Sequence, residues 1–227
     1  MNRLSLAAMA AVVCFSTNAF AGASTFSGAI NGAIDLSIVA TDGSAAADAT
    51  VLESTIHVPG SKKDLLIGVS IQSGVFTETM VKGKNGGTDL ATASGSIGIT
   101  VLLDGNPVAP GKVTFNHREQ ELEATFGGVL DSCEDLNGDG VIDVDQECEV
   151  TDEMIRLMLD TTSANHFNFI APNVGPGEHT LEVMADVSAA ASPSDDKAAH
   201  GEAVVNIGSL TVEVVRSANT VDGITIE

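Results

Sequence analysis

The sequence predicts an all-β protein in which antiparallel strands form a sandwich or a barrel. Apolar residues recur at every second position in one segment after another, which is the pattern of half-buried strands. Turn signals rich in Gly, Pro, Asn and Asp separate these segments at short intervals. No segment keeps a helical apolar stripe over three turns, and the best helical candidate, residues 119–126, alternates equally well as a strand. Many short strands with regular turns are typical of an antiparallel sandwich or barrel.

The predicted strands follow one another along the whole chain. Their alternating apolar positions are, in order, Ile34, Leu36 and Ile38; Leu52, Ile56 and Val58; Leu65, Ile67, Val69 and Ile71; Ile97, Ile99, Val101 and Leu103; Val113 and Phe115; Leu122, Ala124 and Phe126; Ile155, Leu157 and Leu159; Phe167 and Phe169; Leu181 and Val183; Val205 and Ile207; and Leu210, Val212 and Val214. The turns between them include Asp42-Gly43, Pro59-Gly60, Asp104-Gly105, Pro110-Gly111 and Gly127-Gly128.

Three segments interrupt this alternation and are predicted to be loops. Residues 82–96 are rich in Gly and Ser, residues 188–201 are rich in Ala, Ser and Asp, and residues 130–152 are strongly acidic. A domain boundary near residue 130 is one interpretation. A single β-sandwich domain over residues 22–227, with residues 131–152 inserted as a loop, needs fewer assumptions and is the one we adopt.

The first 21 residues have the features of a cleavable signal peptide. Arg3 gives a positive start, residues 4–15 are apolar, and Ala19-Phe20-Ala21 fits a cleavage site between small residues. We therefore predict export, to the periplasm, the cell envelope or the medium. No later segment approaches the ~20 apolar residues of a membrane helix, so no membrane span is predicted.

The charge of the chain limits its partners. The formal net charge is −21, and loss of Arg3 with the signal makes it −22. Nucleic acids and anionic lipid surfaces are disfavoured, because binding them requires basic patches that displace counterions. Divalent cations are favoured. At 44% apolar residues, the chain is rich enough to form a packed core.

Ten of the 31 acidic residues lie between Asp131 and Glu153, with no Lys or Arg among them. Two cysteines flank the middle of this run. An even pair in an oxidising compartment predicts one disulfide, Cys133 to Cys148. It would close a loop of about 15 residues and contribute about 3 kcal/mol through loop entropy.

Between the cysteines, the sequence resembles the twelve-position calcium loop of EF-hand and dockerin proteins. The matching positions are Asp135, Asn137, Asp139, Gly140, Val141, Ile142 and Asp143. The resemblance implies that Ca²⁺ is the cofactor, bound by the side chains of Asp135, Asn137, Asp139 and Asp143 and by the carbonyl of Val141. Gly140 allows the sharp turn, and Ile142 is expected to anchor the loop through apolar contacts.

The last position of the loop departs from that family. Gln146 stands where a bidentate carboxylate is usual, and its one neutral oxygen lowers the expected affinity; Asp145 and Glu147 are alternatives for the missing ligand. The flanking helices of the family are also absent. We expect a dissociation constant of roughly 10⁻⁵ to 10⁻³ M and a structural role for the ion. The alternative is an acidic surface turn that binds no metal, and Mg²⁺ is a poorer candidate because it requires compact octahedral geometry.

A second resemblance concerns the fold. Residues 175–183, GPGEHTLEV, are similar to a late strand of bacterial immunoglobulin-like domains, in which a Pro-Gly turn precedes the strand. This implies an immunoglobulin-like β-sandwich and carries no activity with it.

Other functional sites have weaker support. His57, His117, His166, His179 and His200 share no metal-binding spacing, although His166 and His179 would face each other if their strands paired. No motif of a nucleophile elbow, zinc protease or phosphate loop is present, so we predict that the protein is not an enzyme.

Sugar binding usually requires Trp or Tyr, and the chain has neither; its candidate phenylalanines, Phe115, Phe126, Phe167 and Phe169, are predicted to be core. The predicted function is calcium binding by an exported structural or interaction protein. A carbohydrate- or protein-binding surface module is the alternative, with a hydrolase ranked below it.

Overall fold

The computed structural model describes residues 25–83, 86–194 and 198–215. The predicted signal peptide, residues 1–21, lies outside these ranges. The strands are β1 (Phe26–Asn31), β2 (Leu36–Ala40), β3 (Gly43–Val58), β4 (Lys63–Gly83), β5 (Thr88–Leu103), β6 (Asn106–Pro107), β7 (Val113–Thr125), β8 (Val129–Cys133), β9 (Cys148–Thr151), β10 (Glu153–Val174), β11 (Gly177–Ser192) and β12 (Ala199–Val215). Within the described ranges there is one short helix, α1, which spans Val144–Glu147.

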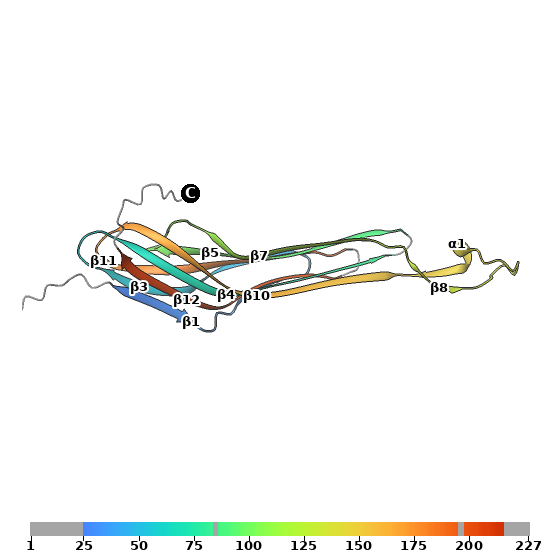
Figure 1. Cartoon of the computed structure of the whole chain (residues 1–227), viewed down its shortest axis with the longest axis horizontal. Coiled ribbons are helices and arrows are strands. Elements are labelled where there is room, and N and C mark those ends of the chain that lie inside the picture. The colour runs from blue at the N-terminus through green and yellow to red at the C-terminus, as the bar shows by residue number, and fades with distance from the viewer. Residues whose placement is uncertain (1–24, 84–85, 195–197, 216–227) are drawn as a thin grey trace, which may run out of the picture.

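Two antiparallel sheets face each other, as Figure 1 shows. One has the order β1-β12-β4-β10, with β2 also paired to β12, and the other has the order β3-β11-β5-β6, with β7 also paired to β5. A separate ribbon, β8-β9, extends from one end. The prediction of an all-β, antiparallel, immunoglobulin-like sandwich is confirmed. Within the described residues, no helix is long and apolar enough to cross a membrane.

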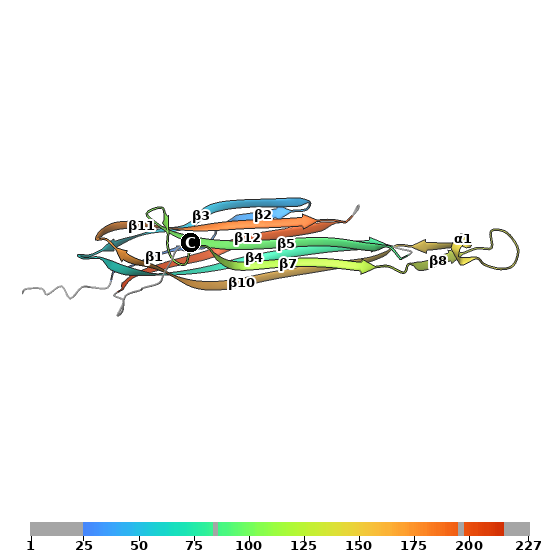
Figure 2. The same ribbon diagram turned by 90° about the horizontal axis from the view of Figure 1, so that it is seen from above.

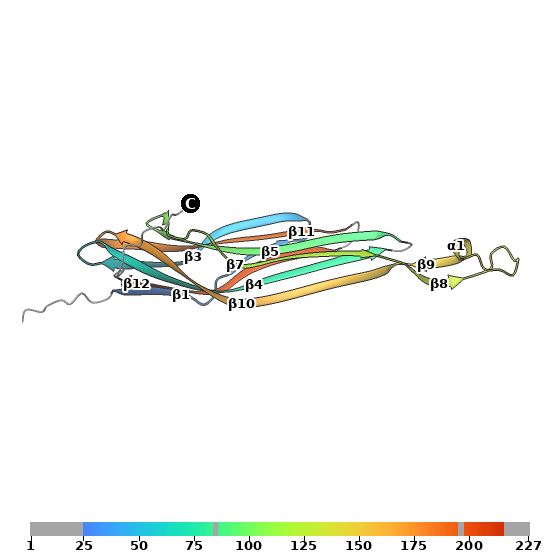
Figure 3. The same ribbon diagram turned by 45° about the horizontal axis from the view of Figure 1, so that its top comes forward.

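The molecule is elongated and has three parts (Figures 1 and 3). We call the end that holds β1 the body. The arm comprises residues 73–83 of β4, 88–96 of β5, 117–125 of β7, 153–163 of β10, 188–192 of β11 and 199–205 of β12. The tip is the segment 129–151. The domain division made from the sequence stays a prediction.

The body has a core of large aliphatic side chains. Ile67 and Val69 of β4 lie opposite Ile97 and Ile99 of β5 in one continuous cluster, and Phe169 of β10 is fully buried in it. These are the alternating positions seen in the sequence, because every second side chain of a strand points to the same face.

The arm is thin because its interior is lined by small residues. Buried alanines from β11 and β12 replace the large side chains of the body. A Cβ at Gly95 would lie 2.7 Å from the carbonyl oxygen of Glu202, and one at Gly201 would lie 2.6 Å from that of Ala190. The two sheets therefore approach each other almost backbone to backbone at these glycines.

The prediction that residues 82–96 and 188–201 are loops is wrong over most of their length. β5 already begins at Thr88, β11 continues to Ser192, and β12 begins at Ala199. Their Gly, Ala and Ser residues are common in loops, but here they allow two sheets to pack closely. The acidic loop predicted at 130–152 also contains parts of β8 and β9 and the helix α1.

Two predictions about β10 are also wrong. The segments around Leu157 and Phe169 form a single strand rather than two, and Phe167 is 37% exposed although it was assigned to the core. His166 and His179 do not face each other, because β10 and β11 belong to different sheets. The other candidate phenylalanines, Phe115, Phe126 and Phe169, are buried as predicted.

Candidate metal centre

The tip begins as a two-stranded ribbon closed by a disulfide. β8 pairs with β9, and Cys133 lies directly opposite Cys148 in the register. The two sulfur atoms are bonded at 2.08 Å, which confirms the predicted disulfide. The backbone N–H of Glu134 donates to the carbonyl of Glu147 at 2.9 Å and continues the ladder one step beyond the bridge. The acidic loop therefore starts and ends at a covalently fixed point.

The first half of the loop is a series of tight turns held by its own side chains. Both carboxylate oxygens of Asp135 accept backbone N–H groups, from Gly138 at 2.6 Å and from Gly140 at 2.8 Å. Asn137 Oδ1 accepts from the N–H of Asp139 at 2.8 Å. Gly138 and Gly140 have φ of 75° and 81°, a left-handed conformation that glycine adopts without strain. The oxygens of Asp135 and Asn137 consequently point inward over the turn.

The second half contains the short helix α1. Asp143 is its N-cap, and its Oδ1 accepts from the N–H of Asp145 at 3.2 Å. Gln146 Nε2 donates to Asp143 Oδ2 at 3.0 Å, so the amide nitrogen of Gln146 is the atom turned toward the loop. The N–H of Val141 donates to Asp139 Oδ1 at 2.8 Å. All six predicted ligand residues thus lie in one short disulfide-closed loop.

Glu147 is the residue that organises this loop. Its side chain is the one buried acid of the tip, at 7% exposure. Its Oε1 accepts from the N–H groups of Leu136 at 3.0 Å and Asn137 at 3.2 Å, and its Oε2 accepts from that of Asp143 at 2.9 Å. These bonds, first that from Asp143, lower the pKa of the Glu147 carboxyl below its usual value of 4.5.

From the sequence, Glu147 is only an alternative ligand. The calcium-loop pattern stops at the preceding residue, Gln146, so the pattern gives no reason to prefer Glu147. Its only signal in the sequence is its place directly before Cys148, which ties it to the fixed end of the loop. Its two contacts to the opposite side of the loop, with Leu136 and Asn137, become visible only in three dimensions.

Ile142 does not anchor the loop as predicted. It is 48% exposed, and its apolar neighbours Leu136, Val141 and Val144 are exposed as well. The tip consists of a two-stranded ribbon and one helical turn, which leave these side chains uncovered.

The donor atoms of the loop suit a hard cation, because carboxylate, amide and carbonyl oxygens are the ligands that calcium prefers. In the conformation described, Asp135, Asn137, Asp139 and Asp143 each bond to backbone N–H groups of the loop itself. Over the part of the chain that the structure describes, no three His, Cys, Asp or Glu residues converge closely enough to hold a metal ion. The oxygens that accept these N–H groups have further lone pairs, so coordination would require the side chains to converge but not to give up their backbone bonds.

A second cluster of polar groups lies at the body end, far from the tip (Figure 1). His179 Nδ1 lies 2.7 Å from Asp104 Oδ2, and His179 Nε2 lies 3.0 Å from the carbonyl oxygen of Gly175. The bond to Asp104 raises the pKa of His179 above 6.5 and lowers that of Asp104 below 3.8. Both ring nitrogens are already hydrogen-bonded, so the histidine connects two turns and leaves no nitrogen for a general base.

An open cavity of about 350 Å³ adjoins this pair and is lined mainly by apolar residues, among them Leu103, Val108 and Ile170.

Comparisons with known proteins do not assign the chain to a family. No protein-family model matches it, and no curated protein is similar to it. Solved structures that align with it include a structure of infectious bursal disease virus Gx strain, at 10% identity and a TM-score of 0.14, and the VP2 subviral particle of infectious bursal disease virus, at 12% identity and a TM-score of 0.16. The alignments cover 84% and 86% of this chain but only 42% and 43% of the viral chains. Structural similarity at TM-scores this low supports no conclusion about function.

Proposed function

We propose that the tip loop binds one Ca²⁺ ion and that the protein is an exported structural or interaction β-sandwich. The observation that supports this most is the turn at Asp135, Asn137 and Asp139, in which oxygen ligands at alternate positions are directed inward around Gly140. The same side chains also accept backbone N–H groups of the loop, and these bonds fix the inward direction of their oxygens. The disulfide lowers the entropy that the loop loses when it is ordered around an ion.

The ligands in this proposal are the side chains of Asp135, Asn137, Asp139 and Asp143 and the carbonyl of Val141, with Gln146 as the sixth residue. The three backbone contacts of Glu147 favour a different role for that residue, since its carboxylate already holds the two halves of the loop at a fixed separation. Six oxygens with only three carboxylates fit a site of moderate affinity, with a dissociation constant of roughly 10⁻⁵ to 10⁻³ M.

Such a site would be filled in a calcium-rich medium, which agrees with the export predicted from residues 1–21. The ion would then rigidify the tip, and no catalytic step is part of the proposal. The glycan-binding alternative has little support, because Phe115, Phe126 and Phe169 are buried and the chain contains no Trp or Tyr.

Titration calorimetry on the protein purified after export tests the proposal. Chelator-treated wild type should bind one Ca²⁺ per chain and gain thermal stability, whereas Mg²⁺ should bind more weakly. The variant Asp135→Ala/Asp139→Ala should lose both effects. The control Glu119→Ala/Glu121→Ala removes the same charge from exposed positions of the arm and should bind Ca²⁺ as the wild type does. Absence of binding by the wild type, or equal loss in the control, would contradict the proposal.

A further inference from the structure

The arm carries a long apolar run that is exposed on both faces. All seven residues from Met154 to Asp160 are exposed, including the five large apolar side chains Met154, Ile155, Leu157, Met158 and Leu159, at 38% to 59% exposure. A run with large apolar side chains on both faces, here broken only by Arg156, is typical of a strand covered on both faces by other parts of a protein. In β10 this run lies in solvent, so its composition indicates a partner that the single chain does not supply.

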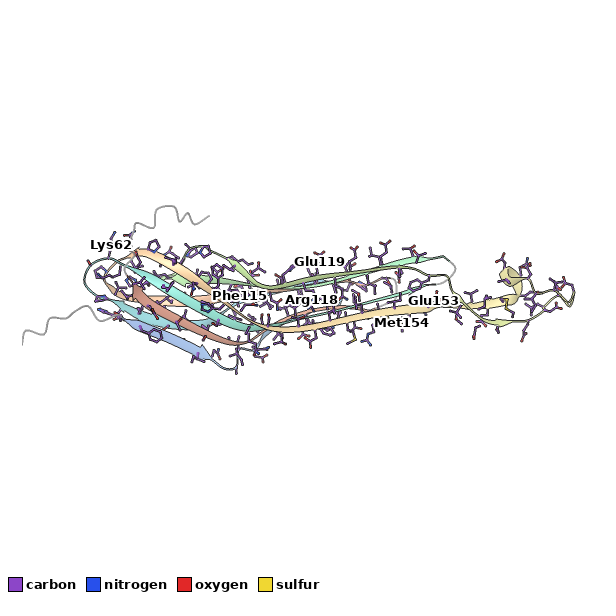
Figure 4. All side chains as sticks on the ribbon, in the orientation of Figure 1. Lys62, Phe115, Arg118, Glu119, Glu153 and Met154 are labelled. Atoms are coloured by element: carbon purple, nitrogen blue, oxygen red, sulfur yellow. A yellow bond between two sulfur atoms is a disulfide. The ribbon has the colours of Figure 1, made fainter. Side chains whose placement is uncertain are left out.

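This part of β10 is also an edge strand. It pairs with β4 over its length, and among the described residues no second strand pairs with its other side along 153–169. Figure 2 shows β10 running along one side of the molecule next to β7, and the two ribbons cross toward the tip. β7 reaches it only through side chains, such as Gln120, whose Nε2 donates to the carbonyl oxygen of Leu157 at 3.1 Å. Figure 4 shows Arg118 directed from β7 toward this strand.

The features that usually protect an edge strand from pairing are missing here. Such strands are commonly short, or interrupted by proline, a bulge or an unpaired lysine. β10 runs without proline or register shift from Glu153 to Ala171. Its one basic residue in the exposed run, Arg156, is paired with Glu78 at 2.7 Å, which neutralises its charge. The edge is therefore straight and mostly apolar, and no strand of the described residues pairs with its outer side, although the carbonyl of Leu157 accepts from the Gln120 side chain.

The run is self-complementary about Leu157. If two copies are placed antiparallel with their Leu157 residues opposite each other, Ile155 of each copy lies opposite Leu159 of the other. Ile155, Leu157 and Leu159 lie on the face of β10 that lines the interior of the arm, because their partners in β4 are buried. On the other face, Arg156 lies diagonally across from both Asp160 and Arg156 of the second copy, and its ion pair with Glu78 of its own chain limits the repulsion between the two arginines. The match is therefore one of apolar positions.

From this symmetry we propose that the protein forms a twofold homodimer by antiparallel pairing of β10 from two copies, centred on Leu157. The paired segment, residues 153–161, spans about 30 Å and joins the β4-β10 layers of both arms into one continuous sheet. The interface is isologous, so the assembly closes at two copies. This inference does not depend on the calcium proposal, because the tip is not part of the interface.

The charge of the chain makes this association dependent on salt. Glu119, Glu121 and Glu123 are exposed along β7, beside the proposed interface, and the full chain carries a net charge of −21, or −22 without residues 1–21. Repulsion between the copies is screened over ~8 Å at physiological ionic strength and less effectively at low salt. The dimer dissociation constant should therefore fall as NaCl is raised from ~0.05 M to ~0.5 M.

Disulfide trapping tests the register. In the proposed dimer the Cα atoms of the two Leu157 residues are about 5 Å apart, so Leu157→Cys should form an intermolecular disulfide under mild oxidation. In the control Ile155→Cys, the two introduced cysteines would be about 14 Å apart along the strands and should not cross-link. Equal trapping of both variants, or none with Leu157→Cys, would overturn the proposal.

Analytical ultracentrifugation of the exported protein tests the surface independently. Wild type should show a concentration-dependent monomer–dimer equilibrium, and Leu157→Lys should raise the dissociation constant at least about tenfold. Leu90→Lys is the matched control, since Leu90 is an exposed leucine on the other sheet of the arm and should leave the equilibrium unchanged. A wild type that stays monomeric at all concentrations and salt levels, or a dimer that both variants weaken equally, would refute the β10 interface.

Discussion

The close approach of the two sheets at Gly201 should make this glycine essential for stability. In Gly201→Ala the added Cβ would meet the backbone carbonyl oxygens of Ala190 and Ser94 in the opposite sheet. The oxygen of Ala190 alone must retreat by about 0.8 Å, from 2.6 Å to the 3.4 Å of ordinary contact. Strand backbone moves only together with its neighbours, so the strain cannot be relieved by rotating one side chain.

Overpacking of a close-packed interior costs about 1–3 kcal/mol, and a clash with two backbone oxygens belongs at the upper limit, about 3 kcal/mol. For a chain of this length, that loss corresponds to a fall in Tm of about 6–12 °C. Urea unfolding gives the free energy directly, and calorimetry gives the Tm. Gly32→Ala is the control, because a Cβ at Gly32 meets nothing within 4 Å. If Gly201→Ala unfolds at the same urea concentration as Gly32→Ala, the account of the sheet contact is wrong.

Three further predictions concern the tip and the body. Replacing Cys133 and Cys148 together by Ser should lower the free energy of unfolding by about 3 kcal/mol, because 15 residues separate the bridged positions; an unchanged urea midpoint would contradict this. Because folding raises the pKa of His179, its stabilising contribution should be complete below about pH 6.5 and lost as the pH rises through the raised value; the Tm difference between wild type and His179→Gln should shrink over that range, and a constant difference would exclude the effect. Phe169→Ala should cost about 3–5 kcal/mol and Phe167→Ala only about 1 kcal/mol, since one ring is fully buried and the other is 37% exposed; equal losses in urea unfolding would contradict the burial difference.

Sequence patterns predicted the strands of the body well. Residues such as Ile67, Val69, Ile97 and Ile99 alternate strictly, and each is fully buried. Alternation reports which side chains share a face of a strand, and large β-branched residues on one face need a core to cover them. The disulfide was predicted from two cysteines in a chain with the features of an exported protein, and it is present.

Sequence patterns predicted the strands less well where the side chains are small. Residues 88–96 were predicted to be a loop from their Gly, Ala and Ser content, yet they belong to β5 and line the narrow interior of the arm. A small residue is compatible with a turn or with a close sheet contact. The deciding factor is whether an opposing backbone is present, as it is at Gly95, and that depends on residues more than 90 positions away.

The sequence alone therefore determined the all-β class, the body core, the disulfide and the acidic loop of oxygen donors between the two cysteines. These properties depend on local spacing and on residue chemistry. Only the tertiary structure decided that Glu147 braces the loop, that the arm is thin, and that the apolar run of β10 lies on an open edge. Each of these depends on which distant segment lies next to a residue, and strand periodicity carries no information about that neighbour.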